Sequence, residues 1–237
     1  MPRAPRPSLH HHYTHVMNRR VDRTPLFESR QEYDEFASLL GWAQREDSIE
    51  ITSWCLMPNH WHLVLRPNDP RQLSSFMHRL ETTHAVGFRS RTGTRGHGSV
   101  YGGRFKSFPI PPDRLLRAVV YVERNPVKAG FVQQATAWRH GSAADGDTPA
   151  GWPNVTRLPT ELERLRPDLL TRPLPEEFET EFARWCANGG DSRRAIDGPA
   201  MQEVRARLDA IDQLRRHASR GAVTPHPREP EAPRTRG

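Results

Sequence analysis

Residues 57–65 read Met-Pro-Asn-His-Trp-His-Leu-Val-Leu, which combines a tight Pro-Asn turn with the start of an apolar strand. Side chains on a strand alternate between its two faces, so His60 and His62 project from one face and Trp61 from the other. Trp61 is expected to pack beneath the sheet. Two neighbouring imidazoles are half of a metal site, although such a pair on a strand is more often two ordinary polar side chains. The pair therefore needs a second segment before it indicates chemistry.

Strand and helix patterns alternate on both sides of this hairpin. Ser29 followed by Glu32 is a capping box, which predicts the start of a helix whose apolar residues recur at helical spacing. The predicted elements, in chain order, are a strand over 13–17, the capped helix after residue 29, strands over 48–56 and 60–66, a helix over 73–88 and a strand over 104–108.

This order predicts an α+β fold of the ferredoxin-like type, in which two helices pack on an antiparallel four-stranded sheet. One additional helix follows, over 112–125, and Pro126 is expected to end it.

Changes in composition divide the chain into five predicted parts. The predicted parts are a disordered N-terminus over 1–9, a folded domain over 10–138, a linker over 139–160, a helical C-terminal extension over 161–218 and a disordered tail over 219–237. Apolar stripes over 176–186 and 199–217 predict helices within the extension.

The charge balance indicates a polyanionic partner. The formal net charge is +7 and the sequence pI is about 10.2. Lys106 and Lys128 are the only lysines, so arginine carries almost all of the positive charge. Arginine suits bidentate contacts to phosphate, but a GC-rich genome would also favour arginine codons. The excess of positive charge is therefore stronger evidence for a polyanionic partner than the high proportion of arginine.

Cysteine use and hydropathy predict a cytoplasmic protein. The two cysteines, Cys55 and Cys186, lack the spacing of a metal motif and fit a reducing compartment. No apolar run is long enough to cross a bilayer, and no secretion signal is recognisable at the start. We therefore expect no association with a membrane.

Tyr121 is the residue that gives the histidine pair a possible function. It lies off the apolar stripe of the helix over 112–125, and its neighbours at helical spacing include Arg114, Arg117 and Asn125. An amphipathic tyrosine at a helix edge is the ordinary interpretation. The chemical interpretation is a phenol positioned to attack a phosphate that nearby guanidinium groups hold.

Four motifs together resemble the REP-associated tyrosine transposases, which belong to the single-tyrosine HUH superfamily and are IS200-like. They span roughly residues 13–138. The motifs are Tyr-Thr-His-Val-Met-Asn-Arg at 13–19, Cys-Leu-Met-Pro-Asn-His-Trp-His-Leu at 55–63, Gly-Arg-Phe-Lys-Ser at 103–107 and Tyr-Val-Glu-Arg-Asn-Pro-Val-Lys-Ala-Gly at 121–130. The resemblance implies that the additional helix carries the catalytic tyrosine.

Residue roles follow from this resemblance. It implies that Tyr121 is the nucleophile and that His60 and His62 bind a divalent metal, Mg²⁺ or Mn²⁺. Asn125 matches the polar residue that completes metal binding in related enzymes, although C-capping is its ordinary role. We assign DNA binding to basic and polar residues of the first strand, the Gly-Arg-Phe-Lys motif and the last helix: His15, Asn18, Arg19, Arg104, Lys106, Arg114 and Arg117. His15 could instead support the metal site.

The function implied is cleavage and rejoining of single-stranded DNA at hairpin-forming palindromic repeats, through a 5′-phosphotyrosine intermediate. The main alternative is a domesticated protein that binds hairpin DNA without strand transfer. An RNA-binding module of the same fold and a metal-dependent nuclease that uses water are further alternatives. The sequence leaves open whether the protein is a monomer or a homodimer.

Overall fold

The structure is a computed structural model, and it describes residues 12–187. The predicted terminal tails over 1–9 and 219–237, and the helical pattern over 199–217, lie outside the described residues.

Four strands form one antiparallel sheet in the order β2-β3-β1-β4. The strands are β1 (Thr14–Arg19), β2 (Glu50–Met57), β3 (His60–Arg66) and β4 (Lys106–Pro109). Two long helices, α1 (Arg30–Asp47) and α2 (Gln72–Arg91), connect them in the order β1-α1-β2-β3-α2-β4. The α+β class and the ferredoxin-like arrangement predicted from the sequence are thus confirmed.

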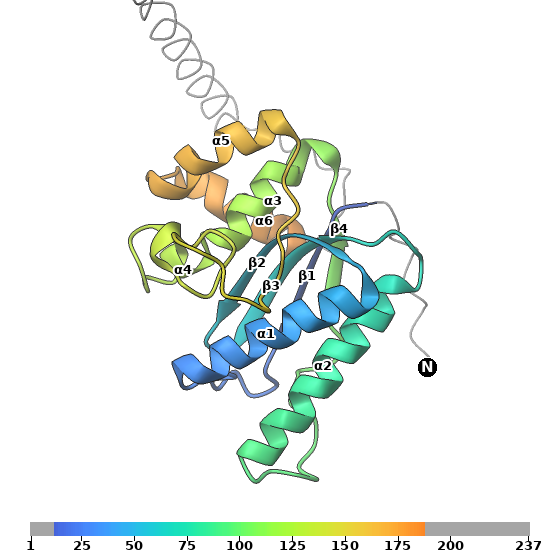
Figure 1. The fold of residues 1–237 in the computed structure, drawn as a ribbon. Helices are drawn as coiled ribbons and strands as arrows, with labels where there is room; N and C mark the ends of the chain where they lie inside the picture. Colours follow the sequence, from blue (N-terminus) through green and yellow to red (C-terminus); the bar gives the residue numbers. More distant parts are fainter. Residues whose placement is uncertain (1–11, 188–237) are drawn as a thin grey trace, which may run out of the picture. The chain divides into compact units, whose positions relative to one another are not determined.

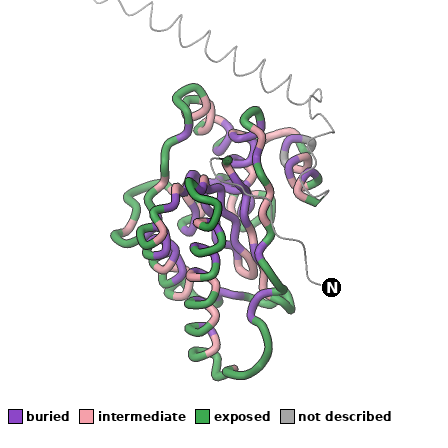
Figure 2. Tube along the Cα trace, turned by 90° about the vertical axis from the view of Figure 1, so that its right-hand side faces the viewer, coloured by how far each residue is buried: buried purple, intermediate pink, exposed green. Residues whose placement is uncertain are grey.

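The two faces of the sheet have different covers, because side chains alternate along each strand. Val16, Trp61 and Leu63 are fully buried on the face that α1 and α2 cover, where they join the main hydrophobic core. Figure 1 shows α1 and α2 side by side on this face, and Figure 2 shows the strands buried between exposed helix surfaces. Trp61 lies beneath the sheet as expected.

The opposite face is covered by α3 (Leu115–Glu123), which packs on β2 and β3 (Figure 1). Two further helices, α5 (Thr160–Thr171) and α6 (Glu176–Ala187), pack on α3. The histidine pair faces α3, because it alternates along β3 with Trp61 of the core and the ring of His62 contacts that of Tyr121 on α3.

The segment predicted as one helix over 112–125 is divided into three. A 3₁₀ turn, η1 (Pro112–Arg114), precedes α3, and the short helix α4 (Asn125–Lys128) follows it. Pro126 lacks an amide hydrogen and its ring would collide with the carbonyl of the preceding turn, so α3 cannot continue through it. The chain instead starts a new turn with Pro126 near its N-terminus, where the missing hydrogen costs nothing.

Residues 139–160, predicted as a linker, lie along the outer edge of β2. Leu56 donates its backbone N–H to His140 O at 2.9 Å, and Thr156 donates to Ile51 O at 2.8 Å. The segment thus pairs with the exposed edge of the sheet, which would otherwise present unpaired backbone groups. These hydrogen bonds hold the segment against the folded domain, whereas a free linker would make no such contacts. A short 3₁₀ turn, η2 (Ala135–Ala137), precedes it.

In the described part of the chain, no helix has the combined length and apolar character of a membrane span.

Candidate active site

His60 and His62 lie side by side at the start of β3, and their ring centroids are 4.9 Å apart. The Nδ1 atom of each ring is already hydrogen bonded. His60 Nδ1 lies 2.7 Å from Asn59 Oδ1, and His62 Nδ1 lies 2.9 Å from His15 Nε2. The Nε2 atoms are therefore the ring nitrogens that remain as potential donors to a metal.

Burial keeps both imidazoles of the pair neutral. It lowers the pKa of His60 to about 4, with the positive charge of Arg19 as a smaller cause. Burial also lowers the pKa of His62 well below its ordinary value, and the neighbouring histidines and Arg19 act in the same direction. A neutral imidazole has a free lone pair, which is the form that binds metal ions.

Tyr121 lies on α3 directly above the histidines. Its ring centroid is 5.8 Å from that of His62 and 6.0 Å from that of His15, and both ring pairs are nearly perpendicular. Burial raises the pKa of Tyr121 to about 12, and Arg19 opposes this rise. Lys128 Nζ lies 5.7 Å from the centre of the tyrosine ring. The phenol and the imidazole pair thus share one site.

Arg114 and Arg117, predicted to bind DNA, are buried beneath α6 instead. Arg117 is 4% exposed and forms an ion pair with Glu181 of α6. The guanidinium of Arg114 lies 5.9 Å from the ring of Trp185, also on α6. Neither arginine is exposed beside Tyr121 in the described structure, because α6 covers that side of α3, so their predicted contact with DNA stays a prediction.

Asn125, the first residue of α4, hydrogen bonds to the last turn of α3. Its Nδ2 atom donates to Tyr121 O at 2.8 Å and to Val122 O at 3.4 Å. This is the capping role considered from the sequence. Only the amide oxygen of Asn125 is then left as a possible metal donor.

A cavity of about 410 Å³ opens beside Tyr121 and is lined by positive charge. Three predicted DNA contacts line it: Arg19 at the end of β1, Arg104 in the loop before β4 and Lys106 at the start of β4. The sequence interpretation missed two further arginines of the cavity, Arg20 and Arg23. Their position in the polar loop after β1, directly beside Arg19, was the available signal.

Two other predicted DNA contacts have internal roles. His15 also lines the cavity, but it is 1% exposed and its Nε2 atom lies 2.9 Å from His62 Nδ1. Asn18 lines the cavity, but its Nδ2 atom donates to Glu81 Oε1 at 2.7 Å and to Gly103 O at 3.1 Å. Asn18 therefore attaches β1 to α2 and to the glycine-rich loop before β4.

Helix α6 closes the other side of the site. Phe182 is fully buried, and its ring centroid lies 5.0 Å from that of Tyr121 and 5.4 Å from that of His15. Cys186 Sγ lies 3.4 Å from His15 Nδ1. The side chains that enclose the phenol thus include residues about sixty positions later in the chain.

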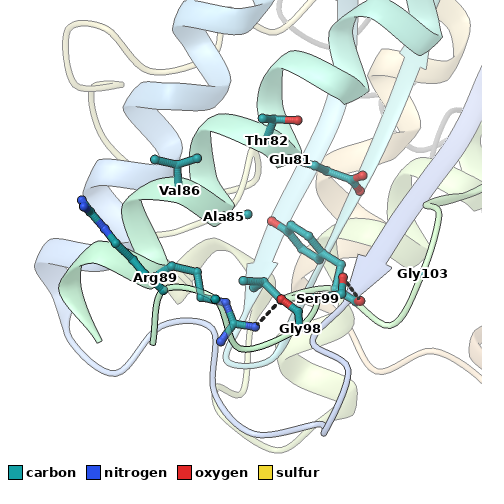
Figure 3. Close-up of a pocket in the computed structure, with 12 residues that line it drawn as sticks. Glu81, Thr82, Ala85, Val86, Arg89, Gly98, Ser99 and Gly103 are labelled. Carbon is teal, nitrogen blue, oxygen red and sulfur yellow. Dashed lines mark hydrogen bonds between the residues drawn. The ribbon is translucent and has the colours of Figure 1, made fainter. Parts of the chain in front are cut away.

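A second cavity, of about 520 Å³, lies between α2 and the loop that precedes β4 (Figure 3). Glu81, Val86 and Arg89 line it from α2, and Arg89 donates to Gly98 O across its floor at 2.9 Å. It contains neither the histidine pair nor Tyr121. Within residues 12–187, no group of three or more His, Cys, Asp or Glu side chains is arranged to hold a metal ion.

Comparison with known proteins defines the class of the chain. Residues 8–125 match the family described as "Transposase IS200 like", and the match includes His60, His62 and Tyr121. This match to the IS200-like transposase family confirms the resemblance drawn from the four motifs.

Two individual proteins illustrate the relationship. The chain is 28% identical over 117 residues to the REP-associated tyrosine transposase of Escherichia coli (strain K12), an alignment that covers 46% of this chain and 66% of that relative. The alignment thus spans slightly less than two thirds of the relative's length. The chain is also similar to a solved structure of a REP-associated tyrosine transposase bound to a REP hairpin, with 23% identity, a TM-score of 0.48 and coverage of 67% of this chain and 95% of that chain.

Proposed function

We propose that this protein cleaves and rejoins single-stranded DNA at hairpin-forming repeats, with Tyr121 as the nucleophile. The observation that carries the proposal is the 5.8 Å separation of the Tyr121 and His62 rings on a sheet face beside a cation-lined cavity. The match to the IS200-like transposase family and the likeness to a REP-associated tyrosine transposase support DNA as the substrate, and the hairpin form of that DNA is part of the proposal.

The donor set fits a divalent metal ion, Mg²⁺ or Mn²⁺. His60 and His62 would hold it through their Nε2 atoms, since both Nδ1 atoms are engaged elsewhere. The amide oxygen of Asn125 is a further candidate ligand. Imidazole ligands suit Mn²⁺ better than Mg²⁺, and phosphate oxygens would complete the shell of either. When bound, the ion supplies charge neutralisation at the scissile phosphate and helps to orient it for in-line attack.

The reaction that we propose exchanges one phosphodiester for another. Tyr121 Oη forms a bond to phosphorus while the bond from phosphorus to the 3′ oxygen breaks. The phenol proton ends on the departing 3′ oxygen, which leaves a 3′-hydroxyl and a 5′-phosphotyrosine. Because the new ester keeps the energy of the bond that was broken, a second 3′-hydroxyl can reverse the step and join a strand without ATP.

Positive charge guides the DNA backbone to the phenol in this proposal. Arg19, Arg104 and Lys106 line the cavity beside Tyr121 and are available for phosphate contacts. Tyr121 and His62 of one chain already lie together, so we propose that the active site is complete within a single chain. The proposal is compatible with either a monomer or a homodimer.

A covalent adduct tests the nucleophile. We expect the wild-type protein, incubated with Mn²⁺ and a single-stranded hairpin oligonucleotide, to give a protein–DNA adduct that survives a denaturing gel. Tyr121→Phe removes only the attacking oxygen, so adduct formation is expected to fall by at least about a thousandfold while hairpin binding persists. The matched control is Tyr33→Phe, which alters a half-buried tyrosine of α1 and should leave the adduct unchanged.

The denaturing gel, together with a native gel-shift assay for hairpin binding, separates the competing functions. Adduct formation by Tyr121→Phe at the wild-type level would refute the assignment of the nucleophile. Cleavage without an adduct would indicate a nuclease that uses water. Hairpin binding without cleavage would support the second candidate, a hairpin-binding protein that no longer transfers strands, which the close packing of Phe182 on Tyr121 favours.

A further inference from the structure

A third histidine, His15 of β1, is part of the buried site. Its ring lies end to end with that of His62, with centroids 5.2 Å apart and planes 10° from parallel. Its Nε2 atom lies 2.9 Å from His62 Nδ1. Phe108 and Phe182 enclose the ring of His15 at centroid distances of 5.9 and 5.4 Å. The ring is thus packed between aromatic side chains with its Nε2 atom toward His62.

The contact between the two rings constrains their protons. A neutral imidazole carries one N–H donor and one lone-pair acceptor, so a hydrogen bond between two such rings needs one nitrogen of each kind. If His62 gives its Nε2 lone pair to a cation, its proton is on Nδ1 and is donated to His15 Nε2. The proton of His15 is then on Nδ1, which faces Cys186 Sγ at 3.4 Å, and sulfur can accept a weak hydrogen bond.

His60 offers an independent comparison on the same strand. Asn59 Nδ2 donates to Arg23 O at 2.7 Å, which identifies the other amide atom of Asn59 as the oxygen. That oxygen can only accept, so His60 Nδ1 carries the proton at this 2.7 Å contact. His60 is thereby held in the form with a free Nε2 lone pair.

We infer that His15 is a positioning residue for His62: it accepts the Nδ1 proton of His62 and so holds the Nε2 lone pair ready for a metal ion. His15 does for His62 what Asn59 does for His60. The inference rests on the proposed function in that a metal ion is the ligand of the pair. It replaces the prediction that His15 contacts DNA. Partners of this kind, one shell outside the metal, commonly change metal affinity by 10- to 100-fold.

Two variants of His15 separate hydrogen bonding from packing. His15→Phe keeps a ring of similar size among Phe108 and Phe182 but cannot accept a proton. His15→Gln can present an amide oxygen close to the position of Nε2. We expect the Mn²⁺ dissociation constant, measured from free Mn²⁺ by electron paramagnetic resonance, to rise about 10- to 100-fold for His15→Phe and clearly less for His15→Gln. Equal affinities for wild type and His15→Phe would overturn the inference.

A second measurement needs no change at His15 and no metal. Long-range ¹⁵N–¹H correlation spectra of the metal-free wild-type protein report which ring nitrogen of His62 carries the proton, with the signal assigned by its loss in His62→Asn. We expect the Nδ1–H form. A predominant Nε2–H form would overturn the inference. Absence of Mn²⁺ binding by the wild type would contradict the proposed function, while these spectra would still decide the role of His15.

Discussion

At the scale of single residues, consecutive side chains of β3 lie on opposite faces of the sheet. Trp61 is fully buried among the rings of the helix-covered core, whereas His60 and His62, one position away on each side, face α3 and Tyr121. This follows directly from the period of two in a strand. The residue pattern was therefore enough to predict which side chains of β3 could act together.

His84 is a titratable residue of the core that has no part in the proposed site. It lies on α2 and is 7% exposed, with Nδ1 2.7 Å from Tyr101 Oη. Burial lowers its pKa to about 3, and the positive charge of Arg91 acts in the same direction. In the unfolded chain the pKa returns to about 6.5, so below that pH the unfolded state binds a proton that the native state does not.

We therefore expect His84 to contribute to acid destabilisation between about pH 6.5 and pH 3. The free energy of unfolding of the wild type should fall faster with decreasing pH than that of His84→Gln. The difference between the two proteins should change by about 1.4 kcal/mol between pH 5.5 and 4.5. Urea denaturation at both pH values measures it, and the other histidines cancel in the comparison. A difference that is independent of pH would contradict this prediction.

At the scale of elements, the segment over 139–160 packs so closely on α1 that one helix position has room only for glycine. Gly41 is buried within α1, and a β-carbon at this position would lie 2.1 Å from Gly151 O and 2.6 Å from Trp152 C. Glycine is unfavourable in a helix interior, so its presence here reflects the close approach of residues 139–160. The segment is thus packed against both β2 and α1.

This packing predicts an unusual outcome for a helix substitution. Alanine is normally favoured over glycine in a helix by up to about 1 kcal/mol, but Gly41→Ala should destabilise the protein by about 1–3 kcal/mol because backbone atoms must move. Gly87→Ala on α2 is the matched control, since nothing lies within 4 Å of its added β-carbon. We expect Gly87→Ala to raise the unfolding free energy measured in urea, and stabilisation by Gly41→Ala would show that the approach is looser than described.

At the scale of the whole molecule, one buried ion pair joins the tyrosine helix to later parts of the chain. Glu123, two residues after Tyr121, has a fully buried side chain and accepts from Arg166 Nε of α5 at 2.9 Å. Ser142 Oγ donates to the same carboxylate at 2.6 Å. The pair connects α3, α5 and the segment along the edge of β2.

Breaking this pair should destabilise the described domain as a unit. Arg166→Ala leaves the buried carboxylate of Glu123 without its cation, which typically costs about 3–5 kcal/mol. Arg164→Ala changes an exposed arginine of the same helix and should alter stability by less than about 0.5 kcal/mol. Chemical denaturation of the two variants beside the wild type measures both effects. Similar, small effects for both would mean that α5 contributes little to holding α3.

Local patterns were sufficient for the element order, the ferredoxin-like sheet and the shared face of His60 and His62. These features depend on the periods of strands and helices, which are short-range properties of the chain. Family motifs added Tyr121 as their partner. The positions of the remaining candidates depended on contacts between residues far apart in sequence.

Long-range packing decided the rest. Arg114 and Arg117 are as polar in the sequence as Arg19 and Arg104, yet α6 buries the first two and leaves the others beside the cavity. His15 has an ordinary strand context, and only the pairing of β1 with β3 brings it against His62. The physical reason is that distant segments of the chain decide which side chains are buried and which residues they contact. The periodicity of a single segment carries no information about those distant segments.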